Sequence, residues 1–446
     1  MKKTNVRWGI IALIFFATTI NYIDRQVIGL LKPTLQHELG WSEADFGYII
    51  TVFNIAYAIG MVVGGRMLDK CGTRIGYIIT IFVWSLGGML HAAVRSVAGF
   101  ALMRAVLGVG EAGNFPAAVK TTAEWFPKRD RAFATGVFNS GSTIGAIAAP
   151  FIVAVIADAL GWQWAFIITG AAGFVWIVAW LMFYNTPEKH KGVNMAEMEY
   201  IHSDENDTDA SRQTETTNDN TKQMGWRHLF KYPQTYGIFL GRFVTDWVWW
   251  FFLFWIPDYI MTTHDVNLKA TVLPLVIIYA MASGGGLAGG AVSSSFIKAG
   301  YSTDFARKTT ILIFGCLVLV LNIVPYIDNL WLMAVLIGVA ASTHQAWASN
   351  IYTIVSDIYP KNLTASMTGI SSVGGAIGGA LGASFVGLIL NHTGSYTLIF
   401  IIASCMYILA WMILKIFVRG PLKIGYQQSE HFLSPCWDKT RDRLRG

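Results

Sequence analysis

The stretch Gly65-Arg-Met-Leu-Asp-Lys-Cys-Gly-Thr-Arg74 joins two long apolar runs of the chain. Each run has the roughly 20 residues that a helix needs to cross a membrane. Gly65 and Gly72 allow the backbone to turn tightly at the membrane surface, and Asp69 and Arg74 are spaced for a charge-assisted contact. The stretch therefore predicts a hairpin of two transmembrane helices.

Apolar runs of the same length continue on both sides of this hairpin. The chain of 446 residues is 54% hydrophobic and only 13% charged, which excludes a soluble enzyme and favours an all-α polytopic membrane protein. Twelve transmembrane helices are predicted, at residues 8–31, 46–68, 75–95, 98–122, 131–158, 163–184, 236–262, 268–298, 305–327, 329–358, 363–391 and 395–418.

A polar segment divides the twelve runs six and six. It is rich in Asp, Glu, Thr, Asn and Ser, as a flexible linker is, although Met195 to Ile201 favours a short surface helix. The predicted units are a six-helix bundle over 1–185, a cytoplasmic linker over 186–235, a second bundle over 236–420 and a basic cytoplasmic tail over 421–446. The first run is too long for a signal peptide and lacks a small-residue cleavage site, so we expect it to be retained.

The basic residues are distributed unevenly between the two sides of the membrane. Of 33 Lys and Arg, only Lys32, Arg95 and Lys269 fall on one side, so the net charge of +6 reflects the bilayer and does not indicate nucleic-acid binding. The positive-inside rule then predicts an inner-membrane protein with both termini in the cytoplasm. No cofactor motif in a fitting context and no metal-ligand spacing occurs in the sequence, and neither a cofactor nor a metal is expected.

The two halves repeat. A shift of 233 residues aligns 125–136 with 358–369 and places Glu111 on His344. Two copies of a six-helix unit in the same orientation are related by an axis along the membrane normal, and in such transporters the binding site lies between the halves near the midplane.

Charged residues at mid-bilayer depth predict that the chain moves something charged, because each costs roughly 2.5–3.5 kcal/mol on insertion scales. Six residues form this set: Asp24, Arg25, Arg104, Glu111, Arg242 and Asp246. The set is neutral when all six are ionised, so an entering monoanion leaves one negative charge unless a proton enters too. Buried carboxylates take up protons, whereas arginine stays charged. Glu111 has fewer obvious local partners than Asp24, which is next to Arg25, so we expect Glu111 to carry the proton and Asp24 to assist.

Other polar and aromatic residues on the same helix faces are candidates for contacting a substrate. Each has a plainer interpretation as well: ion pairs can lock helices together, a lone histidine is often a satisfied hydrogen-bonding residue, and tryptophans in membrane helices commonly pack. The candidates are Tyr22, Asn139, Arg242, Trp249, Trp250, His344, Gln345 and Trp347.

Several of these motifs resemble a known family. The loop 65–74 resembles the signature loop of the major facilitator superfamily. Three further motifs resemble one family of that superfamily, the anion:cation symporters: Asn21-Tyr-Ile-Asp-Arg25, Arg104 to Pro116 with Glu111, and Glu124-Trp-Phe-Pro127. Two further segments look most like its bacterial hexuronate transporters: Arg242 to Asp258, and Ala341 to Trp347.

This resemblance implies import of a hexuronate such as glucuronate or galacturonate, coupled to protons and driven by alternating access in a monomer. It implies that Arg25 holds the substrate carboxylate, that Glu111 carries the proton, and that Asp24 and Arg104 form a neighbouring switching pair. Residues assigned to conformational change are Gly65, Asp69, Gly72, Arg74 and Asp246. The alternatives are a symporter of an aldonate, tartrate or glucarate, or a transporter-like membrane sensor; Ser142, where aldonate carriers place a longer amide, speaks against galactonate.

Overall fold

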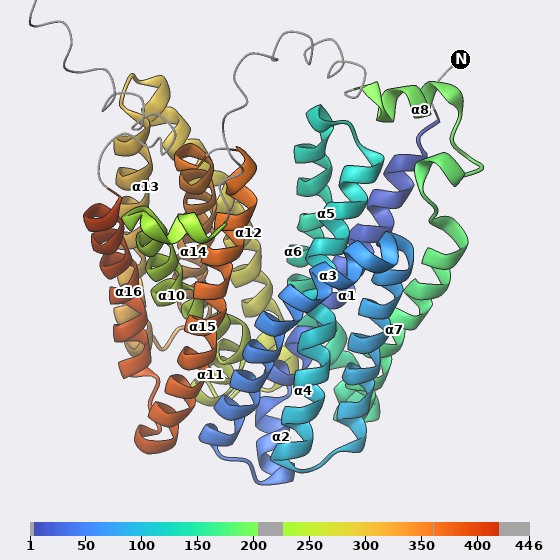
Figure 1. The fold of residues 1–446 in the computed structure, drawn as a ribbon. Coiled ribbons are helices and arrows are strands. Elements are labelled where there is room, and N and C mark those ends of the chain that lie inside the picture. The colour runs from blue at the N-terminus through green and yellow to red at the C-terminus, as the bar shows by residue number, and fades with distance from the viewer. Residues whose placement is uncertain (1–3, 204–225, 360, 419–446) are drawn as a thin grey trace, which may run out of the picture.

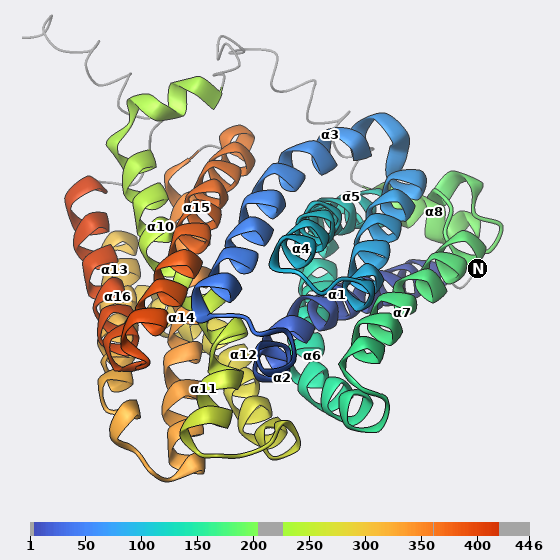
Figure 2. The same ribbon diagram turned by 90° about the horizontal axis from the view of Figure 1, so that it is seen from below.

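A computed structural model describes residues 4–203, 226–359 and 361–418, and the regular elements within these ranges are all helices. The helices form two groups that lie side by side, one from each half of the chain (Figure 1). Seen from below, α1 to α7 form one group and α10 to α16 the other (Figure 2). The predicted all-α fold of two halves is thereby confirmed.

The helix bounds follow the predicted runs closely. The first half contains α1 (Val6–Leu30), α2 (Lys32–Leu39), α3 (Glu43–Leu90), α4 (Val97–Ala112), α5 (Asn114–Trp125), α6 (Lys128–Leu160) and α7 (Trp162–Phe183). The second half contains α10 (Pro233–Phe254), α11 (Ile256–Thr263), α12 (Leu268–Lys298), α13 (Thr303–Leu317), α14 (Leu330–Ile358), α15 (Lys361–Thr393) and α16 (Thr397–Phe417). Short 3₁₀ helices lie at His91–Ala93, Pro187–Lys189, Trp226–Lys231, Val318–Asn322 and Val324–Tyr326.

Eleven helices in the described part of the chain are long and apolar enough to cross a membrane. The remaining predicted run, 98–122, is divided at Gly113 into α4 and α5, each shorter than a span. Pro116 explains the break, because it has no N–H to donate to the carbonyl of Ala112 four residues earlier. Together α4 and α5 cover the twelfth predicted run.

Glycine acts at two places through its missing side chain. Gly72 has φ +75°, a left-handed conformation, and divides α3 into two membrane-spanning parts. Gly378 of α15 lies against α10 so closely that a Cβ there would be 2.0 Å from the carbonyl oxygen of Phe243. The second contact shows that a small-residue stripe on α15 packs this helix onto α10.

The two halves meet through α3 with α15 and α6 with α12. Near the start of α3, Thr51 Oγ1 lies 2.7 Å from Ser384 Oγ of α15 and 3.0 Å from the carbonyl oxygen of Ala380. Nearby, a Cβ on Gly47 would lie 2.8 Å from a backbone oxygen of α15. These contacts lie toward the end of the molecule that carries α2 and α11 (Figure 1).

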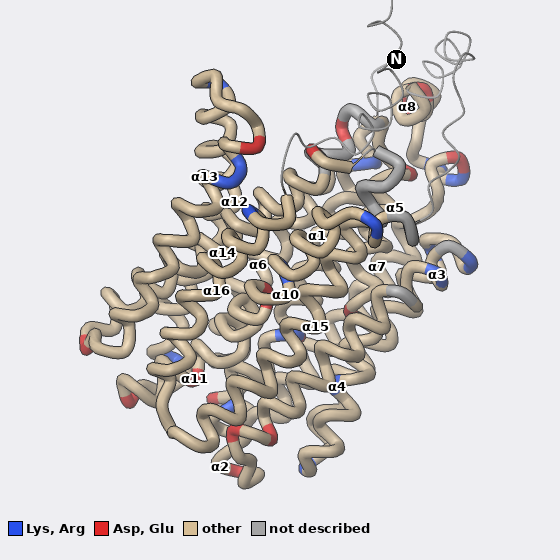
Figure 3. The backbone as a smooth tube through the Cα atoms, turned by 60° about the vertical axis from the view of Figure 1, so that its left-hand side comes forward, with Lys and Arg blue, Asp and Glu red and all other residues tan. Residues whose placement is uncertain are grey.

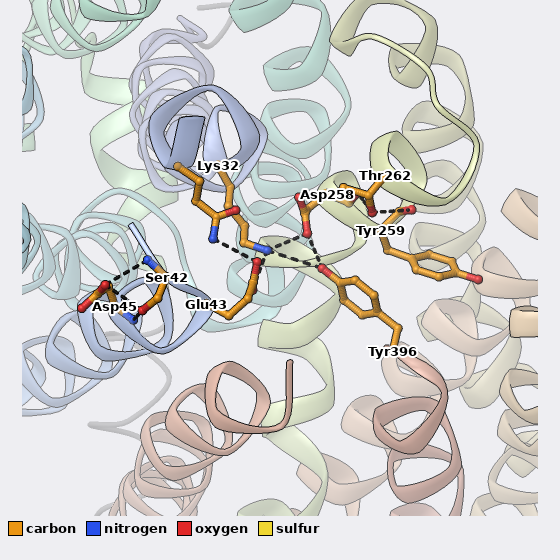
Figure 4. A network of polar contacts seen from close by, with 9 residues as sticks. Lys32, Ser42, Glu43, Asp45, Asp258, Tyr259, Thr262 and Tyr396 are labelled. Carbon is orange, nitrogen blue, oxygen red and sulfur yellow. Dashed lines mark hydrogen bonds and ion pairs between the residues drawn. The ribbon is translucent and has the colours of Figure 1, made fainter. Parts of the chain in front are cut away.

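A buried ion network crosses between the halves at the same end. The Lys32 side chain of α2 is 0% exposed, and its Nζ lies 2.6 Å from Asp258 Oδ2 and 2.8 Å from Glu43 Oε2. Tyr396, next to α16, donates its hydroxyl to Asp258 (Figure 4). One ammonium therefore joins a carboxylate of each half.

Charged residues gather mainly at the two ends of the bundle, with a few between (Figure 3). At the end opposite α2, α8 spans Met195–Ile201, which confirms the predicted short helix. Its Glu197 is fully buried and accepts from Arg7 Nη1 at 3.1 Å, so α8 is anchored to the first half. Residues 204–225 of the predicted linker, and the predicted tail 421–446, lie outside the described residues; the domain boundaries stay a prediction.

Candidate functional site

Arg25 and Glu111 form a buried ion pair between α1 and α4. Arg25 Nε donates to Glu111 Oε2 at 2.8 Å, and the two side chains are 5% and 0% exposed. One helical turn before Arg25, Asn21 accepts from its Nη2 at 3.2 Å. The structure thus brings the predicted anion-binding residue into direct contact with the predicted proton carrier.

Aromatic rings surround the Arg25 guanidinium. Its Cζ lies 4.8 Å from the ring centroid of Tyr22, 4.9 Å from that of Tyr57, 5.5 Å from that of Trp250 and 5.8 Å from that of Phe53. Each such contact contributes about 0.5–2 kcal/mol of cation–π attraction. Because Trp250 belongs to α10, this aromatic cage draws on both halves of the protein.

Arg104 supports the backbone that carries Arg25. Its Nη2 donates to the carbonyl oxygen of Arg25 at 2.9 Å, and its guanidinium lies 4.7 Å above the ring of Phe53. Arg104 is completely buried, and its Nε and Nη1 have no hydrogen-bond partner in the part of the chain that the structure describes.

Asp24 and Arg104 are electrostatic neighbours without a direct ion pair in the described part of the chain, and their role as a switching pair stays a prediction. Asp24 lies beside the hydroxyl of Thr169 and the indole of Trp84. The expectation that Glu111 has fewer partners than Asp24 is wrong, because Glu111 is the carboxylate that meets Arg25. Consecutive residues of a helix point about 100° apart, so Asp24 faces a different neighbour from Arg25.

Arg242 and Asp246 form an ion pair within α10. Arg242 donates to Asp246 Oδ2 from Nη2 at 2.7 Å and from Nε at 3.0 Å, and the side chains are 14% and 13% exposed. Its Nη1 donates to Ser372 Oγ of α15 at 3.1 Å, and Tyr352 of α14 lies 5.0 Å from its Cζ. The second half therefore holds its own partly exposed cation.

His344 is buried between two aromatic residues. Its Nδ1 lies 2.7 Å from the hydroxyl of Tyr407, and its ring stacks on Trp249 with centroids 5.2 Å apart. Trp347 is buried edge-on against Tyr407 at 5.9 Å. The protein thus already supplies a hydrogen-bond partner for His344, a stacking partner for Trp249 and an aromatic neighbour for Trp347, which favours a supporting role for these three residues.

Two predicted polar candidates differ from the rest in exposure. Gln345 is partly exposed and Asn139 is exposed, and the described residues provide no side-chain hydrogen bond to either. Their amides are therefore free to meet a substrate, and that role stays a prediction.

The predicted signature loop is latched to α7. Arg74 donates from Nη1 to Asn185 Oδ1 at 3.2 Å and from Nη2 to the carbonyl oxygen of Leu181 at 3.0 Å. Gly65 is partly exposed beside the turn at Gly72, and the side chain of Asp69 lies outside the described residues. The role of the loop in conformational change stays a prediction.

The sequence reasoning missed residues that complete both charge centres. Phe53 and Tyr57, four residues apart in α3, share the face of the aromatic cage, and a tyrosine inside an apolar run is a signal that could have indicated this. Ser372 and Tyr352 carried no comparable signal, because serine and tyrosine are common in packed membrane helices.

A family model described as Major Facilitator Superfamily matches residues 14–300 and 291–436. The chain belongs to the major facilitator superfamily. It is therefore a transporter and not an enzyme, as the sequence predicted. The inward-open structure of the xylose transporter XylE from E. coli has a TM-score of 0.69 and 15% identity, covering 93% of this chain and 96% of that one; this likeness shows the fold.

Relatives with higher identity are named for sugar acids. The Hexuronate transporter of Escherichia coli (strain K12) is 30% identical over 431 residues, covering 96% of this chain and 98% of that protein. The Probable galactarate/D-glucarate transporter of Bacillus subtilis (strain 168) is 30% identical over 439 residues, covering 95% and 94%. These likenesses place the chain among multi-pass membrane transporters of organic anions.

Proposed function

We propose that this protein imports a hexuronate, glucuronate or galacturonate, together with protons by alternating access. The observation that carries the proposal is the Arg25–Glu111 ion pair inside an aromatic cage shared by the two halves. A guanidinium binds a carboxylate bidentately, which suits the acid group of a uronate. Both relatives described above are named for sugar acids, and the one from Escherichia coli is named for hexuronates.

The same ion pair supplies a route to proton coupling. Glu111 and the substrate carboxylate compete for one guanidinium. When Glu111 is protonated it no longer neutralises Arg25, and leaving a buried charge without its partner costs about 3–5 kcal/mol. An incoming anion relieves this cost, so proton and substrate enter together. Loss of the proton restores the ion pair and expels the anion.

The contacts between the halves support an assignment of the conformational state. The halves are joined at the end that carries Lys32 and Lys269, through the Lys32–Asp258 contact and the Lys269–Asp158 ion pair at 2.6 Å. The positive-inside rule places this end outside the cell and both termini in the cytoplasm. The protein in the inner membrane is then closed to the outside, and import requires the Lys32 network to open.

Uptake into proteoliposomes tests the proposal. Labelled glucuronate and galacturonate are expected to accumulate when the side that carries α2 is more acidic, and only to equilibrate without a pH gradient. Galactonate and glucarate are measured in parallel. Accumulation that is indifferent to the pH gradient would refute proton coupling, and uptake of galactonate or glucarate without uronate uptake would refute the substrate assignment.

A further inference from the structure

We propose that Asp246 makes this transporter select sugar acids with one carboxylate over those with a carboxylate at each end. The inference rests on the proposed function, because it places the first carboxylate of the substrate at Arg25. It bears on the difference between a hexuronate, which has one carboxylate, and an aldarate such as galactarate or glucarate, which has two.

Arg242, the second candidate cation, is already occupied by a residue of its own helix. Nε and Nη2 both donate to Asp246 Oδ2, and Nη1 donates to Ser372. Tyr352 covers one face of the guanidinium at 5.0 Å. A second substrate carboxylate would have to displace a carboxylate that is held four residues away on the same helix, which is an intramolecular competitor at high effective concentration.

The partner of Arg25 is held differently. Glu111 comes from another helix and is completely enclosed, whereas the Asp246 side chain is 13% exposed. The described residues provide no hydrogen bond to Asp246 Oδ1. This oxygen is therefore available to accept a hydrogen bond from a substrate hydroxyl, and it would repel a substrate carboxylate.

The two charge centres are linked through α10. Trp250, which contacts Arg25 at 5.5 Å, follows Asp246 by four residues on α10, a rise of about 6 Å. Five C–C bonds of about 1.5 Å give a six-carbon acid a length of about 6 Å when extended. Tyr22 of the cage and Tyr352 above Arg242 are also electrostatic neighbours.

In this proposal the far end of a substrate anchored at Arg25 lies at the level of Asp246. A hexuronate presents a hydroxyl or aldehyde group there, and a hydroxyl can donate to Asp246. An aldarate presents a second carboxylate to an existing one. The difference between the two substrate classes falls at one residue, and the aspartate acts against the dianion.

A competition assay tests the inference. Uptake of labelled glucuronate is inhibited with unlabelled glucuronate or glucarate in the wild type and in Asp246→Asn. We expect glucarate to compete at least about tenfold more weakly than glucuronate in the wild type. Asp246→Asn is expected to reduce this ratio at least about fivefold, because Arg242 becomes available to the second carboxylate.

Two matched variants separate charge from shape. Asp246→Glu retains the negative charge and is expected to retain the discrimination. Arg242→Gln combined with Asp246→Asn removes the cation as well, so the gain in glucarate competition is expected to disappear. Size-exclusion chromatography in detergent checks that each variant is folded.

The outcomes distinguish this inference from the proposed function. Equal competition by glucarate and glucuronate in the wild type would overturn the inference, even where a variant fails to fold. An unchanged ratio in folded Asp246→Asn would also overturn it. If the wild type transports no uronate at all, the proposed function fails. If the wild type transports glucarate instead, the role given to Asp246 is contradicted as well.

Discussion

Two buried charge centres of this protein place a cation against a carboxylate, and they differ in what surrounds the pair. Arg25 and Glu111 both belong to the first half, and Glu111 Oε1 has no hydrogen-bond partner in the described ranges. Lys32 instead joins Glu43 of the first half to Asp258 of the second. The central ion pair forms within one half, and the outer network forms only when both halves meet.

This difference assigns different tasks to similar chemistry. A pair within one half can exchange a partner for a ligand or a proton without moving the halves. A network across the halves breaks when they separate, because leaving a buried charge unpaired is costly. The centre at Arg25 is therefore suited to sense substrate, and the centre at Lys32 is suited to hold one conformation.

The largest expected effect is on the central pair. Arg25→Lys keeps the positive charge but loses the planar fork that binds a carboxylate bidentately. We expect uronate binding to weaken about 100-fold or more, which corresponds to roughly 3 kcal/mol. Binding to detergent-solubilised protein by calorimetry measures it. Affinity like that of the wild type in Arg25→Lys would remove Arg25 from the site.

Glu111→Gln is expected to separate exchange from accumulation. The amide resembles the protonated acid in shape but cannot release a proton. Counterflow of labelled for unlabelled uronate should survive, while accumulation driven by a pH gradient should be lost. Both assays are run on one proteoliposome preparation. Retained accumulation would move the proton site to Asp24 or His344, and loss of both activities would make Glu111 structural.

Lys32→Met tests the outer network by removing its cation. Asp258 and Glu43 then lack a neutralising cation, so the closed arrangement is destabilised and the halves separate more often at this end. The assay uses Ser384→Cys as a reporter in a protein whose native cysteines are replaced. We expect this cysteine to react about tenfold faster with a membrane-impermeant maleimide added from that side, which corresponds to about 1.4 kcal/mol. An unchanged labelling rate would show that Lys32 does not hold the halves together.

The smallest effect is expected for Lys269→Met, which serves as the matched control. Lys269 and Asp158 also join the two halves, but their side chains are 56% and 59% exposed. Exposed ion pairs contribute little because water and salt screen them. Labelling at Ser384 should change by less than about twofold. An effect as large as that of Lys32→Met would mean that burial does not distinguish the two contacts.

Most of the fold could be predicted because a membrane imposes simple rules. Apolar runs of sufficient length must be helices, since their backbone groups have no water to bind. The runs agree with the helices except at three breaks, at Gly113, at Trp255 between α10 and α11, and after Leu317, where α13 gives way to 3₁₀ turns; Met195–Ile201 was predicted to the residue. The break at Gly113 escaped prediction because the run 98–122 stays apolar across it, and only Pro116 indicated an interruption.

The site could be predicted as a set but not as pairs. Charges at bilayer depth identified Arg25, Glu111, Arg242 and Asp246, because such residues are too costly to keep without a partner. Which carboxylate meets which guanidinium depends on the rotation of each helix. Sequence proximity favoured Asp24 as the acid with more partners. In the structure, the faces that α1 and α4 turn toward each other bring Arg25 to Glu111.

The sequence by itself determined the helices, the division into two halves and the charged residues buried among them. Hydrophobicity and the free-energy cost of placing a charge in the membrane both depend on the local sequence. Only the tertiary structure decided that Trp250 of one half covers Arg25 of the other, and that Lys32, which resembled an ordinary surface lysine, is enclosed between carboxylates. The contacts of Arg25 with Trp250 and of Lys32 with Asp258 join residues more than 200 positions apart, and their geometry follows from how the two bundles dock.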